Sequence, residues 1–236
     1  PIIALEHTAP TSILKQEWLE EIKGMAGDIN VFISDWSREQ WKIQSDNQQV
    51  VHHAVDVELF KPGGYDRSPV VLTVANDFKN RDYCLNYSGW ERITNGIDTK
   101  VIGSSPDGFS EPASCIEELV KEYASTQVYL NTTTVSPIPT SLLEAMACGC
   151  AVVTTATCMI PDIVKHGENG MISNDEKELR SYIEQLLEDE DLRNKLGENA
   201  RQTVIEQFSE ESFISNWSRI FDEAYNIKNN NFYKKA

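Results

Sequence analysis

Short apolar runs alternate with segments of helical periodicity through the middle of the chain. The apolar runs are predicted strands at Val70 to Ala75, Lys100 to Gly103, Gln127 to Leu130 and Ala151 to Thr154. The segments between them are predicted helices at Arg81 to Thr94, Ser114 to Ala124 and Pro139 to Cys148. Short apolar strands that alternate with helices are typical of parallel strands joined by right-handed crossovers. The pattern therefore predicts an α/β fold with a doubly wound, Rossmann-like parallel sheet.

The chain has other patterns on either side of this region. Before it, a cap signal at Thr11 and Ser12 leads into an amphipathic helix that is closed by Gly24 and carries Trp18 in its apolar stripe. The elements that follow this helix are a strand at Asn30 to Ser34, a helix at Asp35 to Ser45 and a strand at Val50-Val51. The elements at the other end are a strand at Gly170 to Ser173, helices up to about Tyr225, and a frayed tail at Asn229 to Ala236. We therefore predict three parts, at residues 1–29, 30–208 and 209–236.

The segment from Ser136 to Gly149 lies between two predicted strands and can bind an anion where its helix begins. Pro139 presets the backbone angle of a helix start, and Thr140 and Ser141 follow it as short polar residues. The first amides of a helix have no helical carbonyl as partner. With the helix dipole they form a phosphate-sized site, at the end of the sheet where open α/β folds bind ligands.

Glu144 lies about four residues, or roughly 6 Å, further along the same helix, and its side chain leans back toward the helix start. A carboxylate at this place can accept two hydrogen bonds from a ribose diol while the amides hold the attached diphosphate. The spacing thus fits a nucleoside diphosphate. The alternative is that Glu144 only complements the helix dipole, and the residues alone leave both interpretations open.

Several short motifs resemble one enzyme family. They are Leu143-Glu-Ala-Met-Ala-Cys-Gly149 with Ala151-Val-Val153, Glu168-Asn-Gly-Met171, His53-Ala-Val-Asp56 with Phe60-Lys-Pro62, and Asn199-Ala-Arg201 with Phe208-Ser209. In this order they resemble the carboxyl-terminal, donor-binding domain of retaining glycosyltransferases of the GT-B architecture, the group 1 or family-four class. The likeness covers about residues 30 to 225.

The resemblance implies roles for particular residues. Glu144 matches the second glutamate of the family's paired-glutamate motif, which holds the donor's ribose, and Lys79 matches the lysine that neutralises the phosphates. These two are the expected catalytic residues. The expected donor-binding residues are Asn76, Lys79, Ser136, Thr140, Ser141, Leu142 and Glu144. Thr140, Ser141 and Leu142 would act through their backbone amides. Without the resemblance, Lys79 reads as a solvated loop lysine.

The chain also departs from the family pattern. Ser136 stands where the family has its first glutamate, which touches the donor sugar, and Asn76 stands where it has an arginine. Residues 1–29 supply only a short remnant of the amino-terminal, acceptor-side domain. His7 lies in this remnant and is a candidate for the cleft, although a lone histidine is more often structural. The other histidines, His52, His53 and His166, are expected to be backbone or loop partners.

Charge and cysteine content narrow the range of partners and compartments. The 236 residues include 21 basic and 37 acidic ones, a net charge of −16, which opposes binding to nucleic acid or anionic membrane. No apolar run approaches the roughly twenty residues that span a bilayer, so the chain is expected to be soluble. Five cysteines without the spacing of a secreted domain indicate a reducing, cytoplasmic location. Cys148 and Cys150 are expected to be buried thiols rather than metal ligands.

Three functions fit these residues in different degrees. The first is transfer of a sugar, with retention, from a UDP- or GDP-type nucleotide-sugar donor to a hydroxyl of a glycan, lipid or protein. No metal or other cofactor is expected, because the helix start and Lys79 neutralise the leaving diphosphate. The second is a non-catalytic nucleotide-sugar-binding module, which Ser136 favours, and the third is another doubly wound enzyme such as an epimerase or phosphorylase. The apolar stripe of the first helix is expected to pack against a partner surface, which predicts a homodimer. The acceptor domain is expected to come from a second subunit or from a separate chain.

Overall fold

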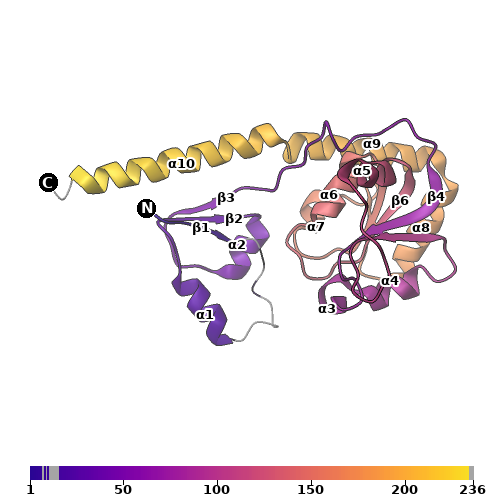
Figure 1. Ribbon diagram of the computed structural model, residues 1–236, viewed down its shortest axis with the longest axis horizontal. Coiled ribbons are helices and arrows are strands. Elements are labelled where there is room, and N and C mark those ends of the chain that lie inside the picture. Colours follow the sequence, from indigo (N-terminus) through magenta and orange to yellow (C-terminus); the bar gives the residue numbers. More distant parts are fainter. Residues whose placement is uncertain (7, 9, 11–15, 234–236) are drawn as a thin grey trace. The chain divides into compact units, whose positions relative to one another are not determined.

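The structure, a computed structural model, describes residues 1–6, 8, 10 and 16–233 and divides into two compact units (Figure 1). Unit 1 comprises residues 1–54 and 210–236, and unit 2 comprises residues 55–209. The boundaries thus fall after Ala54 and after Ser209. The predicted first boundary at residues 29/30 differs, because the segment from residue 30 to 54 belongs to the same unit as the amino-terminus. His7 and the cap signal at Thr11 and Ser12 lie outside the described residues.

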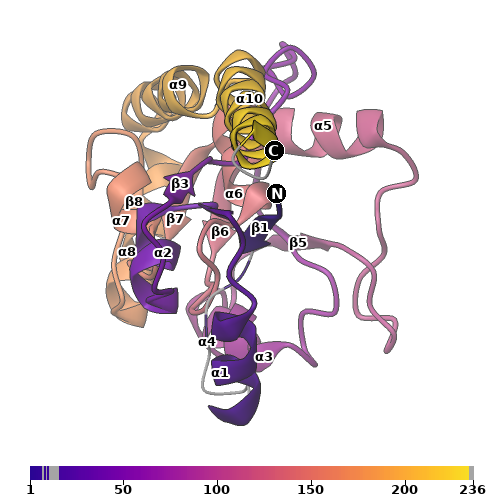
Figure 2. The same cartoon turned by 90° about the vertical axis from the view of Figure 1, so that its left-hand side faces the viewer.

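Unit 1 is a small three-stranded parallel sheet with helices (Figure 2). Its strands, in the order β1-β2-β3, are β1 (Ile3–Glu6), β2 (Ile29–Phe32) and β3 (Gln48–Val50). Its helices are α1 (Gln16–Gly24), α2 (Asp35–Trp41) and α10 (Glu210–Tyr233). Ile220 and Ala224 of α10 share a core cluster with Ile29 and Val31. This shared core explains why the last helix joins the first residues.

The ends of the helices in unit 1 follow from individual residues. Ser34 and Ser37 form a reciprocal capping box at the start of α2, and Lys42 ends the helix in a left-handed conformation with a φ of 51°. The helix therefore stops before the predicted end at Ser45. At the other end of the chain, α10 continues to Tyr233, past the predicted end at Tyr225.

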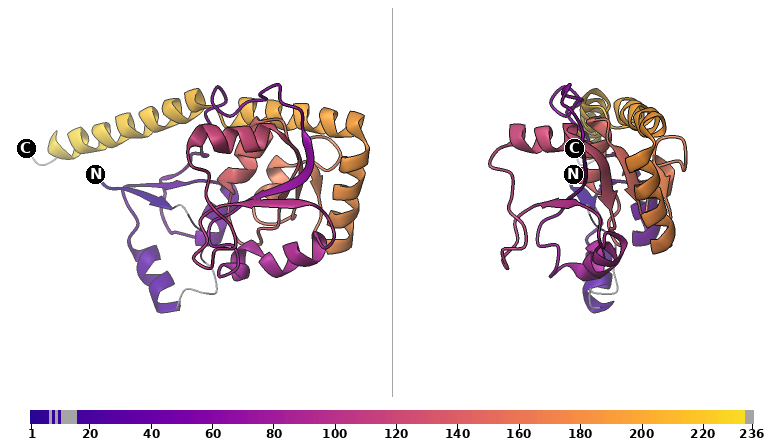
Figure 3. Two further views of the ribbon diagram at one scale, coloured as in Figure 1. Left: turned by 45° about the vertical axis from the view of Figure 1, so that its right-hand side comes forward. Right: turned by 90° about the vertical axis from the view of Figure 1, so that its right-hand side faces the viewer.

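Unit 2 is a five-stranded, all-parallel sheet with helices on both faces (Figure 3). Its strands, in the order β5-β4-β6-β7-β8, are β4 (Ser68–Val74), β5 (Thr99–Ile102), β6 (Thr126–Asn131), β7 (Ala151–Thr154) and β8 (Met171–Ile172). Its helices are α3 (Asp82–Leu85), α4 (Tyr87–Ile93), α5 (Ile116–Ala124), α6 (Thr140–Ala147), α7 (Ile160–Ile163), α8 (Glu176–Glu188) and α9 (Glu190–Gln207). The predicted doubly wound, Rossmann-like α/β fold is confirmed.

The two faces of the larger sheet carry different helices. On one face, Val71, Val128 and Val153 form a core cluster with residues of α4 and α8, among them Trp90 and Ile183. On the other face α5, α6 and α9 pack, with α6 against both β6 and α9. Alternate residues of each strand supply the two cores, as the period of two requires.

The predicted helix from Arg81 to Thr94 is broken at Asn86. This residue adopts a left-handed conformation (φ 55°), ends α3, and caps α4 by accepting a hydrogen bond from the Gly89 amide at 3.1 Å. A Cβ at Gly89 would lie 2.4 Å from the Asn86 side chain, so glycine is needed for the close approach. Asparagine tolerates this backbone region better than most residues, and it could have been read as a break.

The carboxyl ends of the parallel strands bring four loops to one edge of unit 2. These loops are residues 75–81, 103–115, 132–139 and 155–159. The first two are joined, since the Asp77 amide donates to the Ser104 carbonyl at 2.7 Å. Gly103 (φ 148°) makes the approach possible, because a Cβ there would lie 2.0 Å from the Ala75 carbonyl oxygen. The predicted site residues all lie on these loops or on the first turns of α6.

Candidate functional site

The first turn of α6 presents backbone donors that no group of the described residues uses. Pro139 precedes the helix in an extended conformation (φ −69°, ψ 116°), and no side chain caps the helix. The Leu142 amide donates to the Pro139 carbonyl at 3.1 Å, but within the described chain the amides of Thr140 and Ser141 donate no hydrogen bond. Two of the three predicted amide donors are therefore available to a ligand. Such a pair at a helix start, with the helix dipole behind it, favours an anion.

The other end of α6 is closed by two arginines that are distant in sequence. Arg201 of α9 donates to the Ala147 carbonyl at 2.6 Å and also to the carbonyls of Val57 and Phe60. Arg67 donates to the Cys148 carbonyl at 2.8 Å and to the Thr126 carbonyl at 2.6 Å. Cationic side chains at this end complement the helix dipole and fix the helix in the unit.

Glu144, on the second turn of α6, is half-buried and held by a tyrosine. The Tyr123 hydroxyl of α5 donates to Oε2 of Glu144 at 2.9 Å. Burial raises the pKa of the Glu144 carboxyl, and the hydrogen bond from Tyr123 lowers it in part. Within the described residues, Oε1 of Glu144 accepts no hydrogen bond. The fully buried side-chain polar atoms without a partner in these residues belong to Gln127 and Arg193, so Oε1 of Glu144 is not fully buried and reaches solvent. One carboxylate oxygen is therefore free to accept from a ligand.

Ser141 is held by a second buried tyrosine. The Tyr129 hydroxyl of β6 donates to the Ser141 Oγ at 2.9 Å, and the rings of Tyr129 and Tyr123 lie 5.9 Å apart. Burial raises the pKa of both tyrosines, so both hydroxyls are protonated at neutral pH. The two side chains thus fix Glu144 and Ser141 from beneath α6.

Lys79 lies on the loop after β4 and contacts the loop after β5. Its Nζ is 3.4 Å from Oδ2 of Asp107 and 4.2 Å from the centroid of the Phe109 ring. Asp107 also accepts from the Ser105 hydroxyl and the Phe109 amide, and these bonds, with the ammonium, lower the pKa of its carboxyl. The ion pair is largely solvent-exposed, and such pairs contribute little to stability. The ion pair with Asp107 therefore holds the Lys79 ammonium only weakly.

Asn76 and Ser136 occupy the positions where the sequence departs from the family pattern. Asn76 is exposed, and its Oδ1 accepts from the Ser104 amide at 2.9 Å, so it shapes the loop. Ser136 is half-buried, and its hydroxyl makes no hydrogen bond within the part of the chain that is described. Neither residue carries the charge that the family places there.

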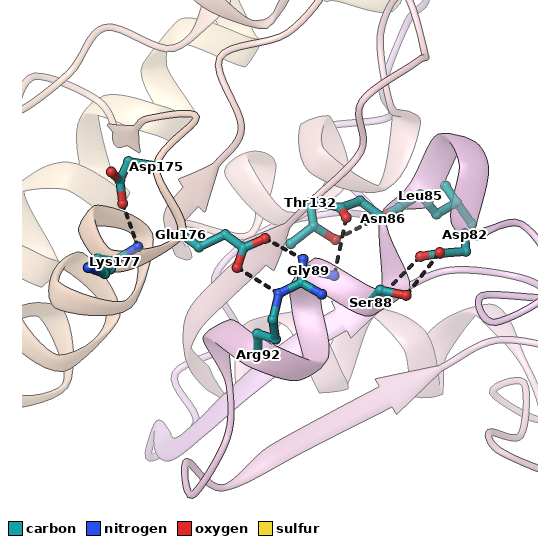
Figure 4. Close-up of polar contacts among 10 residues, drawn as sticks. All are labelled: Asp82, Leu85, Asn86, Ser88, Gly89, Arg92, Thr132, Asp175, Glu176 and Lys177. Carbon is teal, nitrogen blue, oxygen red and sulfur yellow. Dashed lines mark hydrogen bonds and ion pairs between the residues drawn. The ribbon is translucent and has the colours of Figure 1, made fainter.

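Polar contacts tie the segment after Lys79 to the loop after β6 (Figure 4). The Thr132 hydroxyl donates to the Leu85 carbonyl at 2.8 Å. The Thr134 amide donates to the Cys84 carbonyl at the same distance. Asp82 accepts from the amide and hydroxyl of Ser88, which fixes the turn between α3 and α4. The loops after the neighbouring strands β4 and β6 are thus held together.

The predicted site residues form two groups. Thr140, Ser141, Leu142 and Glu144 share α6, and Ser136 precedes them on the same loop. Lys79 and Asn76 lie at the same edge of the sheet, but no hydrogen bond or ion pair joins them to residues 136–144 in the described parts of the chain. Four residues of the site were not indicated by the sequence: Arg67, Asp107, Tyr123 and Tyr129. Arg201 belongs to the Asn199-Ala-Arg201 motif, but its carbonyl partners were not predicted. The roles of all these residues depend on contacts between distant segments.

The remaining candidates have structural roles or lie apart from the site. Nδ1 of His52 is 3.1 Å from the Ile33 carbonyl, and His166 accepts from the Ile172 amide, as predicted. All five cysteines are free thiols, and burial raises the pKa of the Cys150 thiol to about 11. In the described ranges, no three His, Cys, Asp or Glu side chains could hold a metal ion together. None of the helices in the described part of the chain is both long and apolar enough to cross a membrane.

The fold defines an architectural class. A parallel α/β unit of this kind has the architecture of GT-B glycosyltransferases, and solved structures of that architecture superpose on the chain. Sucrose-phosphate synthase from Thermosynechococcus elongatus matches with a TM-score of 0.78 at 16% identity, over 95% of this chain and 68% of that one. HepE of Anabaena, solved in complex with UDP-glucose, matches with a TM-score of 0.76 at 16% identity, over 96% of this chain and 72% of that one. These likenesses establish the fold.

The central segment of the sequence is similar to one family of enzymes. Residues 113–203 match the family model "Glycosyl transferases group 1". The N-acetyl-alpha-D-glucosaminyl L-malate synthase of Bacillus anthracis is 39% identical over 82 residues, which are 34% of this chain and 22% of that protein. The chain thus aligns with about a fifth of this curated relative. The segment that matches the family model, residues 113–203, contains the start of α6 and Glu144, whereas Lys79 and Asn76 lie before it.

Proposed function

We propose that this chain is a glycosyltransferase, or its donor-binding half, and moves a sugar from a nucleoside-diphosphate sugar to a hydroxyl acceptor. The observation that carries the proposal is the open first turn of α6, where the Thr140 and Ser141 amides donate no hydrogen bond to any described residue. This turn lies inside the segment that matches the group 1 family. The diphosphate of the donor would accept from these two amides, and the ribose would donate to Glu144.

The chemical step needs stabilisation of the leaving group. The bond between the anomeric carbon and the diphosphate oxygen breaks, a bond from that carbon to the acceptor oxygen forms, and the proton of the acceptor hydroxyl passes to the leaving diphosphate. Negative charge then grows on the diphosphate, and preorganised amides and a lysine ammonium oppose it. Lys79 supplies the ammonium when the phosphates replace Asp107 as its partner. The resemblance of the α6 motif to retaining enzymes supports transfer with retention.

The proposed donor is a UDP-type sugar, whereas the acceptor is proposed only as a class of hydroxyl groups. HepE, which shares the fold, was solved in complex with UDP and with UDP-glucose, and this favours a UDP-type donor over a GDP-type one. The acceptor is proposed to be a hydroxyl of a glycan, lipid or protein. The net charge of −16 supports an assignment without nucleic acid. The homodimer and the cytoplasmic location stay predictions, and light scattering of the purified chain tests the first.

A binding module without turnover is the second candidate, and Ser136 favours it. The serine has no charge and a shorter side chain than the glutamate that the family uses to touch the donor sugar. Such a chain would bind the nucleotide through α6 and would transfer nothing. The two candidates share the binding site and differ only in catalysis.

Thermal-shift titration tests the shared site first. Wild type and Glu144→Ala are titrated with UDP, GDP, ADP and their sugars, with inorganic phosphate as control. At a hundredfold excess over Kd, binding stabilises the folded state by about 2.7 kcal/mol. Stabilisation of wild type that is reduced in Glu144→Ala supports the site, and no stabilisation by any nucleotide contradicts it. Donor hydrolysis or sugar transfer then separates the enzyme from the module, and NMR of the product's anomeric proton tests retention.

A further inference from the structure

Tyr123 is a buried residue whose hydroxyl has no part in the proposed chemical step. Its side chain is 0% exposed, and its ring lies 6.2 Å from the ring of Phe60 and 5.9 Å from that of Tyr129. The Tyr123 carbonyl accepts from the Cys150 thiol, which ties its backbone to the start of β7. The position of the hydroxyl is therefore fixed by packing on all sides.

The Tyr123 hydroxyl can donate one hydrogen bond, and it donates it to the Glu144 carboxylate. The hydrogen bond to Oε2 is 2.9 Å long, and within the described chain it is the only one that the Glu144 carboxylate accepts. A carboxylate has about four lone-pair sites on two oxygens. With one site occupied by Tyr123, Oε1 and the remaining site of Oε2 can accept from two neighbouring hydroxyls, which matches a ribose diol.

A glutamate without such a partner would search several rotamers before binding a ligand. Ordering a side chain of this length costs conformational entropy. A rigid donor from a buried ring removes much of this search before the ligand arrives. The contact thus prepares the carboxylate for a ligand and does not touch the ligand itself.

We propose that Tyr123 is a positioning residue that holds the Glu144 carboxylate in the orientation in which it accepts the ribose hydroxyls of a nucleoside diphosphate. The proposal rests on the proposed function, since it requires a nucleotide on α6. It acts on the ribose end alone, because the amides of Thr140 and Ser141 do not depend on Tyr123. Tyr129 supplies a matched comparison: it is an equally buried tyrosine whose hydroxyl donates to Ser141 instead of Glu144.

The test compares ligands with and without a ribose. Calorimetric titrations measure Kd for inorganic pyrophosphate and for whichever of UDP, GDP and ADP wild type binds most tightly. In Tyr123→Phe, Kd for the nucleotide is expected to rise about fivefold, as for loss of one net hydrogen bond, and Kd for pyrophosphate to change less than about twofold. Tyr129→Phe is expected to leave the ratio of the two Kd values unchanged.

The pH dependence gives a readout that a purely structural role would not move. Protonation of Glu144 removes an acceptor, so nucleotide affinity falls as the pH drops through its pKa. Since the Tyr123 hydrogen bond lowers that pKa, the fall is expected to begin at higher pH in Tyr123→Phe than in wild type. In a Glu144→Ala background, Tyr123→Phe is expected to have no further effect on nucleotide binding.

Three results would overturn the proposal. Equal weakening of nucleotide and pyrophosphate in Tyr123→Phe would show that the tyrosine only supports α6. An unchanged nucleotide Kd and pH profile in Tyr123→Phe would show that Glu144 needs no positioning. If wild type binds none of the three nucleotides, the proposed function itself fails, and this outcome is distinct from the other two because it appears before any variant is made.

Discussion

The two ends of α6 are built for different purposes. At the carboxyl end, Arg67 and Arg201 satisfy the carbonyls of Cys148 and Ala147, and both arginines reach them from other segments. At the amino end, the amides of Thr140 and Ser141 have no partner in the described chain, and no side chain caps them. One helix of eight residues is thus sealed at one end and open at the other.

The helices of this unit begin in two ways: α4, α8 and α9 have a side-chain cap, whereas α3, α5 and α7, like α6, have none among the described residues. Asp175 caps α8 by accepting from the Lys177 amide at 2.7 Å (Figure 4). It also accepts from the Glu178 amide at 3.3 Å. Capping of this kind stabilises a helix by about 1 kcal/mol. The start of α6 does without it, and the stability of α6 comes from burial and from its closed end. We infer that substitutions at the closed end change stability, and substitutions at the open end change binding.

The largest expected effect is at the closed end. Arg201→Ala leaves the carbonyls of Val57, Phe60 and Ala147 without their donor. Each buried polar group that loses its partner costs about 1–3 kcal/mol, and water entry reduces the total, so we expect the free energy of unfolding to fall by about 3 kcal/mol. Urea titration followed by circular dichroism measures it.

The control for this substitution is an exposed arginine that makes a weak contact. Arg219→Ala removes a single contact of 3.3 Å to Gln49 on an exposed surface, and a change within about 0.5 kcal/mol is expected. The distinction between the two ends would be wrong if Arg201→Ala left stability unchanged and weakened only nucleotide binding.

The second effect is at the open end and concerns one amide. Thr140→Pro removes the Thr140 N–H, and proline is tolerated at the first position of a helix. The residue before it, Pro139, already has the extended ψ of 116° that a following proline requires. We expect Kd for the nucleoside diphosphate to rise about tenfold, the lower end for a hydrogen bond to a charged group, with stability nearly unchanged. Isothermal titration measures the affinity.

Thr140→Ala is the matched control because it removes the side chain and keeps the amide. Its Kd is expected to lie within about twofold of wild type. Equal affinities of Thr140→Pro and wild type would mean that the diphosphate does not use this amide, and equal losses in both variants would assign the effect to the hydroxyl.

The fold was largely predictable, because alternation of apolar and helical segments is a local signal. The predicted strand at Ala151 to Thr154 coincides with β7, and the predicted anion site lies at the start of α6. The break at Asn86 was missed because the apolar period continues across it. Helix α7 was missed too, since four residues are too short to show a period.

The supports of the site could not be read from the sequence in the same way. Arg67 lies 81 residues from Cys148, and Arg201 lies 54 residues from Ala147. Nothing local distinguishes Arg67 from a surface arginine, and the Asn199-Ala-Arg201 motif singles out Arg201 without indicating its partners. Tyr123 and Tyr129 have the same property, since a tyrosine on an apolar strand or helix face predicts a core residue. Only the packing of β6, α5 and α6 directs their hydroxyls at Ser141 and Glu144.

The smallest expected effect concerns Lys79, which would add a cation to the open end. Asp107→Asn keeps Oδ1 as acceptor for the Phe109 amide and removes the charge that faces Lys79. Because exposed ion pairs are weak, we expect nucleoside-diphosphate affinity to rise only about two- to fivefold, and the gain to vanish in roughly 0.5 M salt. The gain should also be absent in a Lys79→Gln background, which shows that it passes through the lysine. A fall in affinity would instead mean that Asp107 holds Lys79 in its binding position, and an unchanged affinity would separate Lys79 from the α6 site altogether.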